Sequence, residues 1–140
     1  EYIKILKIRF PDMFEEEFEV DPECLEYRIP KLTLQPLVEN AINHGLRGKG
    51  HHGLLRIRIG FVEDYLCIRV YDNGIGIEAS TLKEIEEESL TYKEQSFGLR
   101  GTLDRIKLIY NENAKYEIKS RQNEYTEISI YILIRALEKK

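Results

Sequence analysis

Apolar and polar side chains alternate along several segments of the chain, and this period of two predicts β-strands with one buried face. In the first segment, phenylalanine and valine alternate with glutamate, which predicts an acidic outer face. Two other segments flank a turn at residues 63–64 and predict a β-hairpin. The expected strands cover residues 14–20, 55–61, 66–70, 116–120 and 125–134.

Apolar side chains recur at three- and four-residue steps elsewhere, which predicts amphipathic helices. The clearest helix is expected at 31–44, where Pro36 lies near the first turns and Gly45 ends the helix. Further helices are expected at 79–88 and directly after Gly98.

Strands with one apolar face and helices with one apolar stripe predict a two-layer α/β sandwich. Because hairpins dominate over β–α–β crossovers, we expect a mixed, mostly antiparallel sheet covered on one face by about three helices. The length of 140 residues (16.5 kDa) fits one domain, expected at 11–140. Residues 1–10 have helical spacing that Pro11 ends, and they are expected to be the tail of a preceding helix.

The composition narrows the class of protein. With 42% hydrophobic and 33% charged residues, the chain is expected to be a folded globular domain. No apolar run approaches the roughly 18 residues of a membrane span, and no signal peptide is visible. A net charge of −4 argues against nonspecific nucleic-acid binding, and Cys24 and Cys67 are too far apart to predict a zinc site. Because the chain starts at Glu1 and its only methionine is Met13, we expect it to begin inside a longer polypeptide.

The first polar group without an obvious structural purpose lies near the end of the helix expected at 31–44. Asn40, Asn43 and His44 lie one turn apart, so they share a face of an α-helix. Asparagine is a poor helix former, and an amide oxygen beside the carboxylate of Glu39 suits a hard cation such as Mg²⁺. A solvated helix flank explains the same residues equally well.

A second polar group follows the expected hairpin, where Asp72 precedes Gly74 and Gly76. Alternate glycines allow a ligand to approach the backbone closely, and the carboxylate can accept a hydrogen bond from an exocyclic amine such as that of adenine. An ordinary turn is the alternative, because Asp-Asn-Gly also favours turns. The run at 74–79 also fits the G-x-G-x-x-A dinucleotide fingerprint. We reject that interpretation, because a hairpin arm precedes the run instead of the first strand of a parallel unit.

A third motif, FGLRGT at 97–102, is expected to open a helix. Free N–H groups and the positive end of the helix dipole favour an anion such as phosphate there. Arg100, Arg105 and Lys107 add positive charge. The alternative is an ordinary helix start with a glycine hinge. The P-loop sequence, another phosphate-binding motif, is absent from the chain.

The order of these motifs resembles the ATP-binding domain shared by gyrase, Hsp90, histidine kinases and MutL. The run LQPLVENAINHG at 34–45 is similar to the N box of sensor histidine kinases of the LytS and YesM type. GLR at 98–100 and RIKLIY at 105–110 resemble their second glycine box and the helix after it. The likeness extends over nearly the whole chain, residues 10–134.

The resemblance implies that the chain binds ATP and Mg²⁺. By position, Asn40 would coordinate Mg²⁺, Asp72 would bind the adenine amine, and Thr126 would help to hold adenine through water. Gly98 and Gly101 would offer backbone N–H groups to the triphosphate. The other nucleotide contacts that we expect are Asn43, His44, Gly74, Gly76, Ile77, Leu99, Arg100 and Arg105.

The sequence departs from the family pattern at several positions. Asn43 stands where many histidine kinases carry a phosphate-binding lysine, and His44 is the candidate substitute. Gly101 stands where relatives commonly have asparagine. Pro36 occupies the place of the catalytic glutamate of the hydrolytic ATPases, which favours phosphoryl transfer over hydrolysis and leaves Glu39 as the candidate polarising carboxylate.

The resemblance implies the catalytic domain of a two-component sensor histidine kinase, which transfers the ATP γ-phosphoryl group to a histidine on an upstream dimerisation domain. It also implies a homodimer in the full-length protein, a response regulator as the next partner in the phosphorelay, and no nucleic-acid partner. The location implied is cytoplasmic, in a bacterial sensor of the inner or plasma membrane. Two alternatives stay open: a non-catalytic nucleotide-binding or dimer-interaction module, suggested by Asn43 and Gly101, and an anti-sigma-type serine kinase with the same fold.

Overall fold

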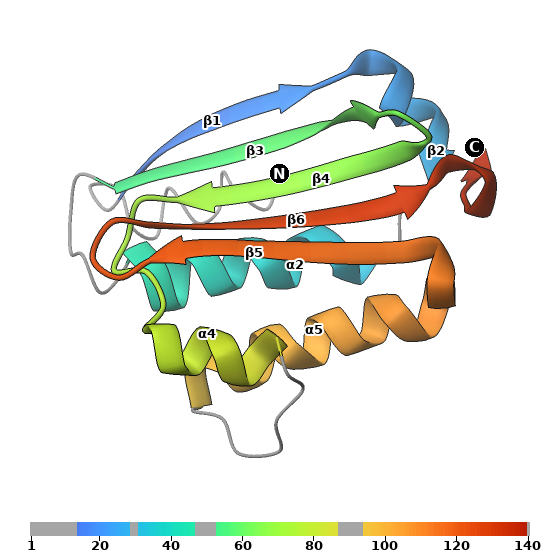
Figure 1. Cartoon of the computed structure of the whole chain (residues 1–140). Coiled ribbons are helices and arrows are strands. Elements are labelled where there is room, and N and C mark those ends of the chain that lie inside the picture. The colour runs from blue at the N-terminus through green and yellow to red at the C-terminus, as the bar shows by residue number, and fades with distance from the viewer. Residues whose placement is uncertain (1–13, 29–30, 47–52, 87–93, 140) are drawn as a thin grey trace.

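The structure, a computed structural model, describes residues 14–28, 31–46, 53–86 and 94–139. Its centre is a five-stranded sheet in the order β1-β3-β4-β6-β5 (Figure 1). The strands are β1 (Phe14–Val20), β3 (Gly53–Val62), β4 (Tyr65–Asp72), β5 (Ala114–Arg121) and β6 (Tyr125–Leu133). β1 pairs parallel with β3, and the other neighbours pair antiparallel. The expected mixed, mostly antiparallel sheet is confirmed.

The described helices lie together on one side of this sheet (Figure 1). They are α2 (Lys31–Asn40), α4 (Ala79–Glu86) and α5 (Glu94–Tyr110). A π-helical segment, η2 (Ala41–Leu46), continues α2. Short 3-10 turns are η1 (Pro22–Glu26), η3 (Asn111–Asn113) and η4 (Ile134–Ala136). The helices on one side of the sheet confirm the expected two-layer α/β sandwich. Within the described ranges, no helix is long and apolar enough to cross a membrane.

Two helix ends differ from the sequence prediction. The helix expected to stop at Gly45 changes to π winding at Ala41 and continues to Leu46, whose side chain is fully buried. The prediction that α5 follows Gly98 is also wrong, because α5 begins at Glu94. Glutamate is a good helix former, and a glycine inside a helix costs only about 1 kcal/mol, which does not end a helix that packing supports.

A second sheet pairs β2 (Tyr27–Arg28) with β7 (Glu138–Lys139) in antiparallel orientation. Alternation could not predict these strands, because two residues are too few to show a period. The ring of Tyr27 also meets the ring of Phe61 edge-on, with centroids 6.1 Å apart. The last described residues are thus held beside the segment that follows β1.

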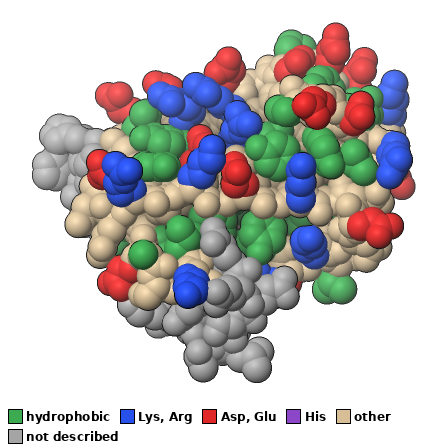
Figure 2. Space-filling view, in the orientation of Figure 1, with side chains coloured by type: hydrophobic (Ala, Val, Ile, Leu, Met, Phe, Trp, Pro, Cys, Tyr) green, Lys and Arg blue, Asp and Glu red, His purple; other side chains and the backbone are tan. Residues whose placement is uncertain are grey.

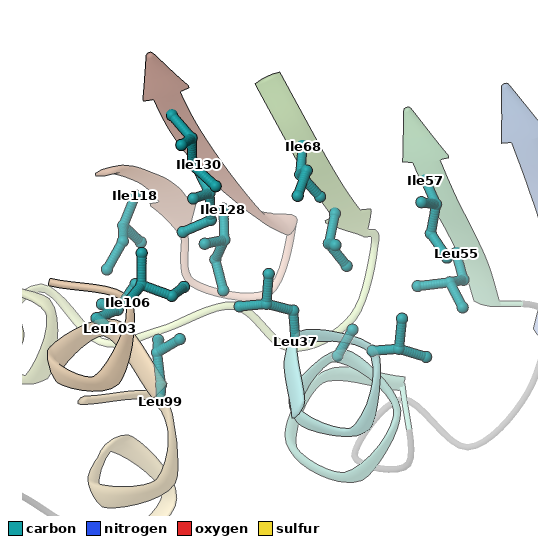
Figure 3. Packing of buried hydrophobic residues seen from close by; sticks show 14 of the residues in the cluster. Leu37, Leu55, Ile57, Ile68, Leu99, Leu103, Ile106, Ile118, Ile128 and Ile130 are labelled. Atoms are coloured by element: carbon teal, nitrogen blue, oxygen red, sulfur yellow. The ribbon is translucent and has the colours of Figure 1, made fainter. Parts of the chain in front are cut away.

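The core fills the space between the sheet and the helices (Figure 3). Leu37 of α2 points toward the sheet, and Leu103 and Ile106 of α5 point toward the strands that carry Ile118 and Ile130. All five side chains are buried. The helices therefore cover the sheet through the apolar stripes that the sequence predicted.

The opposite face of the sheet carries charged side chains in cross-strand pairs. Glu17 and Glu19 of β1 lie opposite Arg56 and Arg58 of β3, with N···O distances of 2.7 and 3.5 Å. Figure 2 shows acidic, basic and hydrophobic side chains interspersed over the visible face of the molecule. Exposed ion pairs contribute only about 0–1 kcal/mol each. The acidic face predicted for the first strand is therefore real, and part of it is paired with arginine.

Leu37→Ala is expected to lower the free energy of unfolding by about 2–5 kcal/mol, because removing this buried side chain leaves a cavity under the sheet. Leu108 gives a matched control, since it lies on α5 and is 79% exposed. Leu108→Ala should change the free energy of unfolding by less than about 0.5 kcal/mol. Urea unfolding followed by circular dichroism measures both variants. Equal losses would contradict the burial of Leu37 under the sheet.

Candidate functional site

Asp72 ends β4 on the side of the sheet that faces the helices. Its side chain is 2% exposed. One carboxyl oxygen accepts a hydrogen bond from the N–H of Gly74 at 3.0 Å. Among the described residues, the other oxygen has no hydrogen-bond partner. A buried carboxyl with a free acceptor therefore lies at the end of an otherwise aliphatic strand face.

Burial raises the pKa of the Asp72 carboxyl from 3.8 to about 7, and the Gly74 N–H opposes this shift only in part. At neutral pH the group is therefore balanced between its neutral and ionised forms. Because the folded pKa lies above the unfolded one, this carboxyl stabilises the fold at low pH, and the contribution is lost as the pH rises through about 7. A ligand that donates a hydrogen bond would favour the ionised form.

Asn73 ties the loop after β4 to the start of β3. Its side-chain oxygen accepts a hydrogen bond from the N–H of Leu54 at 2.6 Å, and its own N–H donates to the carbonyl of Leu54 at 3.2 Å. These bonds continue the pairing of β3 with β4 beyond the last pair, Leu55 with Asp72. The sequence indicated only that Asn73 suits a turn, because its partner lies 19 residues away.

The segment 72–77 lies against the turn between β5 and β6. Gly76 has a φ of +71°, and a Cβ at this position would overlap the carbonyl oxygen of Arg121. The carbonyl of Ile75 accepts a hydrogen bond from the N–H of Asn123 at 2.5 Å. Glycine is therefore required at position 76 by contact with the protein's own backbone.

Ser120 of β5 is paired with Thr126 of β6, and Thr126 is paired on its other side with Asp72. The Ser120 Oγ accepts a hydrogen bond from the N–H of Ile77 at 2.9 Å, lies 2.8 Å from Thr126 Oγ1 and donates to the carbonyl of Tyr125 at 2.8 Å. A row of three polar side chains thus crosses β4, β6 and β5. The sequence did not reveal Ser120, because a serine near a polar strand end carries no distinguishing signal.

Glu39 and Asn40 lie at the end of α2, where π winding begins. Both side chains are half-buried, and Glu39 accepts a hydrogen bond from the amide of Gln35 at 3.2 Å. α2 and η2 pack against β4, so this end of the helix layer lies on the same side of the sheet as Asp72. Single π-helical turns are frequent at functional sites.

Gly98 and Gly101 lie inside α5. Only the first four N–H groups of a helix lack an acceptor within the helix, and in α5 these belong to residues 94–97. The expectation that the Gly98 motif opens the helix is therefore wrong, and the anion site expected there stays a prediction. Gly101 is exposed, and a Cβ there would meet no atom within 4 Å. Arg105 is exposed on the same helix.

Leu99 and Arg100 are buried in the structure. Leu99 is 2% exposed and belongs to the core. Arg100 donates a hydrogen bond to the hydroxyl of Tyr116 at 2.9 Å and forms an ion pair with Asp104 at 2.5 Å. The contact with Tyr116 anchors α5 to β5, while the ion pair with Asp104 lies within α5. The charge of Arg100 suggested phosphate binding, and no local pattern in the sequence pointed to its partner Tyr116 on β5.

The structure brings one group of the expected site residues together around the end of β4. The other expected residues lie elsewhere in the fold or outside its described part. The residues brought together are Asp72, Gly74, Gly76, Ile77 and Thr126. Asn43 and His44 belong to η2, but their side chains lie outside the described part of the chain, as do residues 1–13. The shared helical face expected for Asn40, Asn43 and His44 therefore stays a prediction.

The described residues contain no group of three or more His, Cys, Asp or Glu side chains that could hold a metal ion. Mg²⁺ does not need such a group, because it usually takes one or two protein ligands and completes its shell with water and phosphate oxygens. The half-buried amide of Asn40 fits this requirement.

A hollow of about 450 Å³ lies elsewhere, at the opposite end of the strands, and is lined in part by Val20, Gly60 and Cys67. Gly60 pairs with Cys67 five residues along β3 from the pair of Leu55 with Asp72. The hollow is therefore not part of the candidate site.

Comparison with known proteins identifies the relatives of the chain. Residues 27–136 match the family of histidine kinase-, DNA gyrase B- and HSP90-like ATPases. The sensor protein LytS of Oceanobacillus iheyensis is 39% identical over 93 residues, which cover 66% of this chain and 16% of LytS. The sensor protein kinase HptS of Staphylococcus aureus is 32% identical over 128 residues, which cover 90% of this chain and 24% of HptS. The chain thus spans less than a quarter of the length of these curated relatives.

Solved structures share the fold. The nucleotide-free catalytic domain of the histidine kinase ThkA has a TM-score of 0.65 at 20% identity, with 94% of this chain and 86% of that chain covered. The mycobacterial sensor histidine kinase MprB has a TM-score of 0.63 at 15% identity, with 94% and 88% covered. At these identities the likeness establishes the fold alone.

Two glycine substitutions should have opposite effects on stability. Gly76→Ala is expected to lower the free energy of unfolding by more than about 1 kcal/mol, because its φ is positive and its Cβ meets the backbone of Arg121. Gly101→Ala should raise it by about 0.5–1 kcal/mol, because the helical site has space and alanine is the better helix former. Chemical denaturation measures both, and a stabilising Gly76→Ala would contradict the packing of this loop.

Proposed function

Because the chain belongs to the family of histidine kinase-, DNA gyrase B- and HSP90-like ATPases, we propose that it binds ATP at the end of β4 as the catalytic domain of a sensor histidine kinase. The observation that carries this proposal is the Asp72 carboxyl, which is buried beside Thr126 and keeps one acceptor free among the described residues. The exocyclic amine of adenine could donate a hydrogen bond to this oxygen of Asp72. Gly74 and Ile77 hold the loop through their N–H groups.

The residues that would hold the triphosphate and Mg²⁺ come from the helix layer. Asn40 is the proposed ligand of Mg²⁺, and the phosphate contacts proposed are Asn43, His44, Gly98, Gly101 and Arg105. In α5 the N–H groups of the two glycines lie at positions that bond to carbonyls four residues earlier. Their use as phosphate donors therefore requires the first turn of α5 to open when the nucleotide binds.

Phosphoryl transfer asks for positioning and charge neutralisation rather than covalent chemistry from the protein. Bound Mg²⁺ would neutralise phosphate charge. Glu39 lies one residue before the proposed metal ligand and is the candidate to polarise the attacking group, with Gln35 fixing one of its oxygens. Pro36 stands where the hydrolytic relatives carry a glutamate, which supports transfer to a protein over hydrolysis.

The larger protein is part of the same proposal. LytS and HptS are sensor proteins by name, and the chain corresponds to less than a quarter of each. We propose that residues 11–140 form the catalytic domain and that residues 1–10 are the end of a preceding dimerisation helix. The phosphoryl group would pass to a histidine of that upstream domain in a homodimer and then to a response regulator. The domain would lie on the cytoplasmic side of a bacterial membrane sensor.

Mg-ATP is expected to bind with micromolar to submillimolar affinity, and the affinity should rise by about tenfold from pH 6 to pH 8. A carboxyl with a pKa of about 7 is mostly protonated at pH 6 and mostly ionised at pH 8. Only the ionised form accepts with both oxygens. Isothermal titration calorimetry across this range measures the trend.

Asp72→Asn is the matched control, because it removes the titration and keeps the size of the side chain. This variant should bind ATP more weakly than the wild type at pH 8. Its affinity should also lose the pH dependence that comes from the titration of the Asp72 carboxyl. The absence of both binding heat and thermal stabilisation at millimolar Mg-ATP would contradict the ATP site. If Asp72→Asn bound ATP with the affinity of the wild type, Asp72 would not be part of the ATP site.

Phosphoryl transfer separates the kinase from its alternatives. With labelled ATP and the upstream phosphoacceptor domain of the same protein added in trans, we expect a label that is lost in acid, as phosphohistidine is. Glu39→Gln should reduce the labelling by about 100-fold or more if this group polarises the acceptor. Binding without labelling would indicate a non-catalytic module, and an acid-stable label would indicate a serine kinase.

A further inference from the structure

The hydrogen bonds of Ser120 have a definite direction. A hydroxyl has one proton to donate and two lone pairs that accept. The N–H of Ile77 can only donate, so it uses one lone pair of Ser120 Oγ at 2.9 Å. The carbonyl of Tyr125 can only accept, so it takes the Ser120 proton at 2.8 Å. One lone pair of Ser120 then faces Thr126 Oγ1 at 2.8 Å.

Thr126 must therefore donate its own proton to Ser120. The opposite assignment, in which Ser120 donates to Thr126, would deprive the Tyr125 carbonyl of this donor and satisfy two contacts instead of three. Thr126 is 4% exposed, and unsatisfied polar groups are costly at such sites. With its proton committed to Ser120, the Thr126 oxygen presents only lone pairs to any further partner.

Two acceptors thus lie next to each other on the sheet. Thr126 and Asp72 are directly paired between β6 and β4, and the Cβ atoms of such cross-strand neighbours are about 4.5–5.5 Å apart. Asp72 contributes the oxygen that has no partner among the described residues. An amine with two N–H bonds is the group that satisfies a pair of adjacent acceptors.

We infer that Ser120 is a positioning residue for base selection: it fixes the Thr126 hydroxyl as an acceptor, so that Thr126 and Asp72 together accept the exocyclic amine of adenine and exclude the corresponding carbonyl of guanine. This contact of Thr126 with the base is direct and replaces the contact through water that the resemblance implies. The inference rests on the proposed ATP site. A guanine carbonyl would face two acceptors and find no donor, which leaves buried polar groups unpaired. Ser120 needs no contact with the base to have this effect.

The test compares the dissociation constants of Mg-ATP and Mg-GTP at pH 8 in the wild type and in Ser120→Ala. The wild type should prefer ATP. Without Ser120, the Thr126 hydroxyl is free to rotate and donate, so ATP binding should weaken by about threefold to tenfold while GTP binding weakens less or improves. The preference for ATP should therefore fall by at least about threefold.

Three variants separate this role from a purely structural one. Ser129→Ala removes another buried hydroxyl from β6, on the opposite face of the sheet, and should leave the preference unchanged. Ser120→Thr keeps the hydroxyl and should keep the preference. If Ser120→Ala does not fold, Ser120→Cys is the substitute, because a cysteine side chain has a similar volume and its S–H group is only a weak donor. This variant should also reduce the preference for ATP over GTP.

A double variant tests the mechanism directly. Thr126→Val removes the hydroxyl that Ser120 orients, so adding Ser120→Ala to it should narrow the preference no further. Absence of ATP binding by the wild type would defeat the proposed function. A wild type that binds ATP without preferring it to GTP, or an unchanged preference in Ser120→Ala, would overturn the inference alone. Equal weakening of both nucleotides would also overturn it and assign Ser120 to loop stability.

Discussion

The cost of burying the Asp72 carboxyl is the constraint on which this end of the domain depends. A carboxyl that is 2% exposed is stable as an anion only where donors meet it, and the protein supplies one, the N–H of Gly74. The loop around it is held from two sides, by the bonds of Asn73 to β3 and by the contact of Gly76 with the β5–β6 turn. The shape of the loop is therefore set by the sheet before any ligand arrives.

The helix layer contrasts with this preformed loop. The α-helical winding of α2 changes to π winding directly after Asn40, and Gly98 and Gly101 lie within the regular helix α5. Arg100, two residues after Gly98, holds α5 to Tyr116 of β5, so opening of the helix from its N-terminal end meets an anchor there. In the proposed ATP site, the side that would hold the base is therefore formed in advance, and the side that would hold the phosphates would have to change conformation.

The elements were predictable where one face is buried over many residues. Alternation located the five strands of the main sheet. In β3, β4, β5 and β6 the apolar side chains face the helices, whereas in β1 only Phe14 is buried and Phe18 is 55% exposed. It missed β2 and β7, which are two residues long, and the π winding after Asn40, which leaves the order of apolar residues unchanged. Gly98 was misleading, because a glycine suggests a helix boundary while packing of Leu103 and Ile106 supports the helix through it.

The residues that the fold gathers at the end of β4 were predictable to a similar extent. Asp72 and Gly76 stood out from the sequence, although the reason for Gly76 proved to be the backbone of Arg121. Asn73 and Ser120 did not, because their partners are 19 and 43 residues away and only folding brings them together. Roles that depend on such contacts leave no trace in a local pattern.

The parallel pairing of the edge strand has a mechanical consequence. Phe14 begins β1 opposite Gly53, and the next residue of β3 is Leu54, whose backbone Asn73 holds. The polypeptide that precedes β1 therefore joins the sheet at its Asp72 end, about 10 Å from the loop if each strand spacing is about 4.8 Å. A pull or twist applied to the chain ahead of Phe14 acts first on β1, and the pairing of β1 with β3 passes it to the strand that holds Asn73.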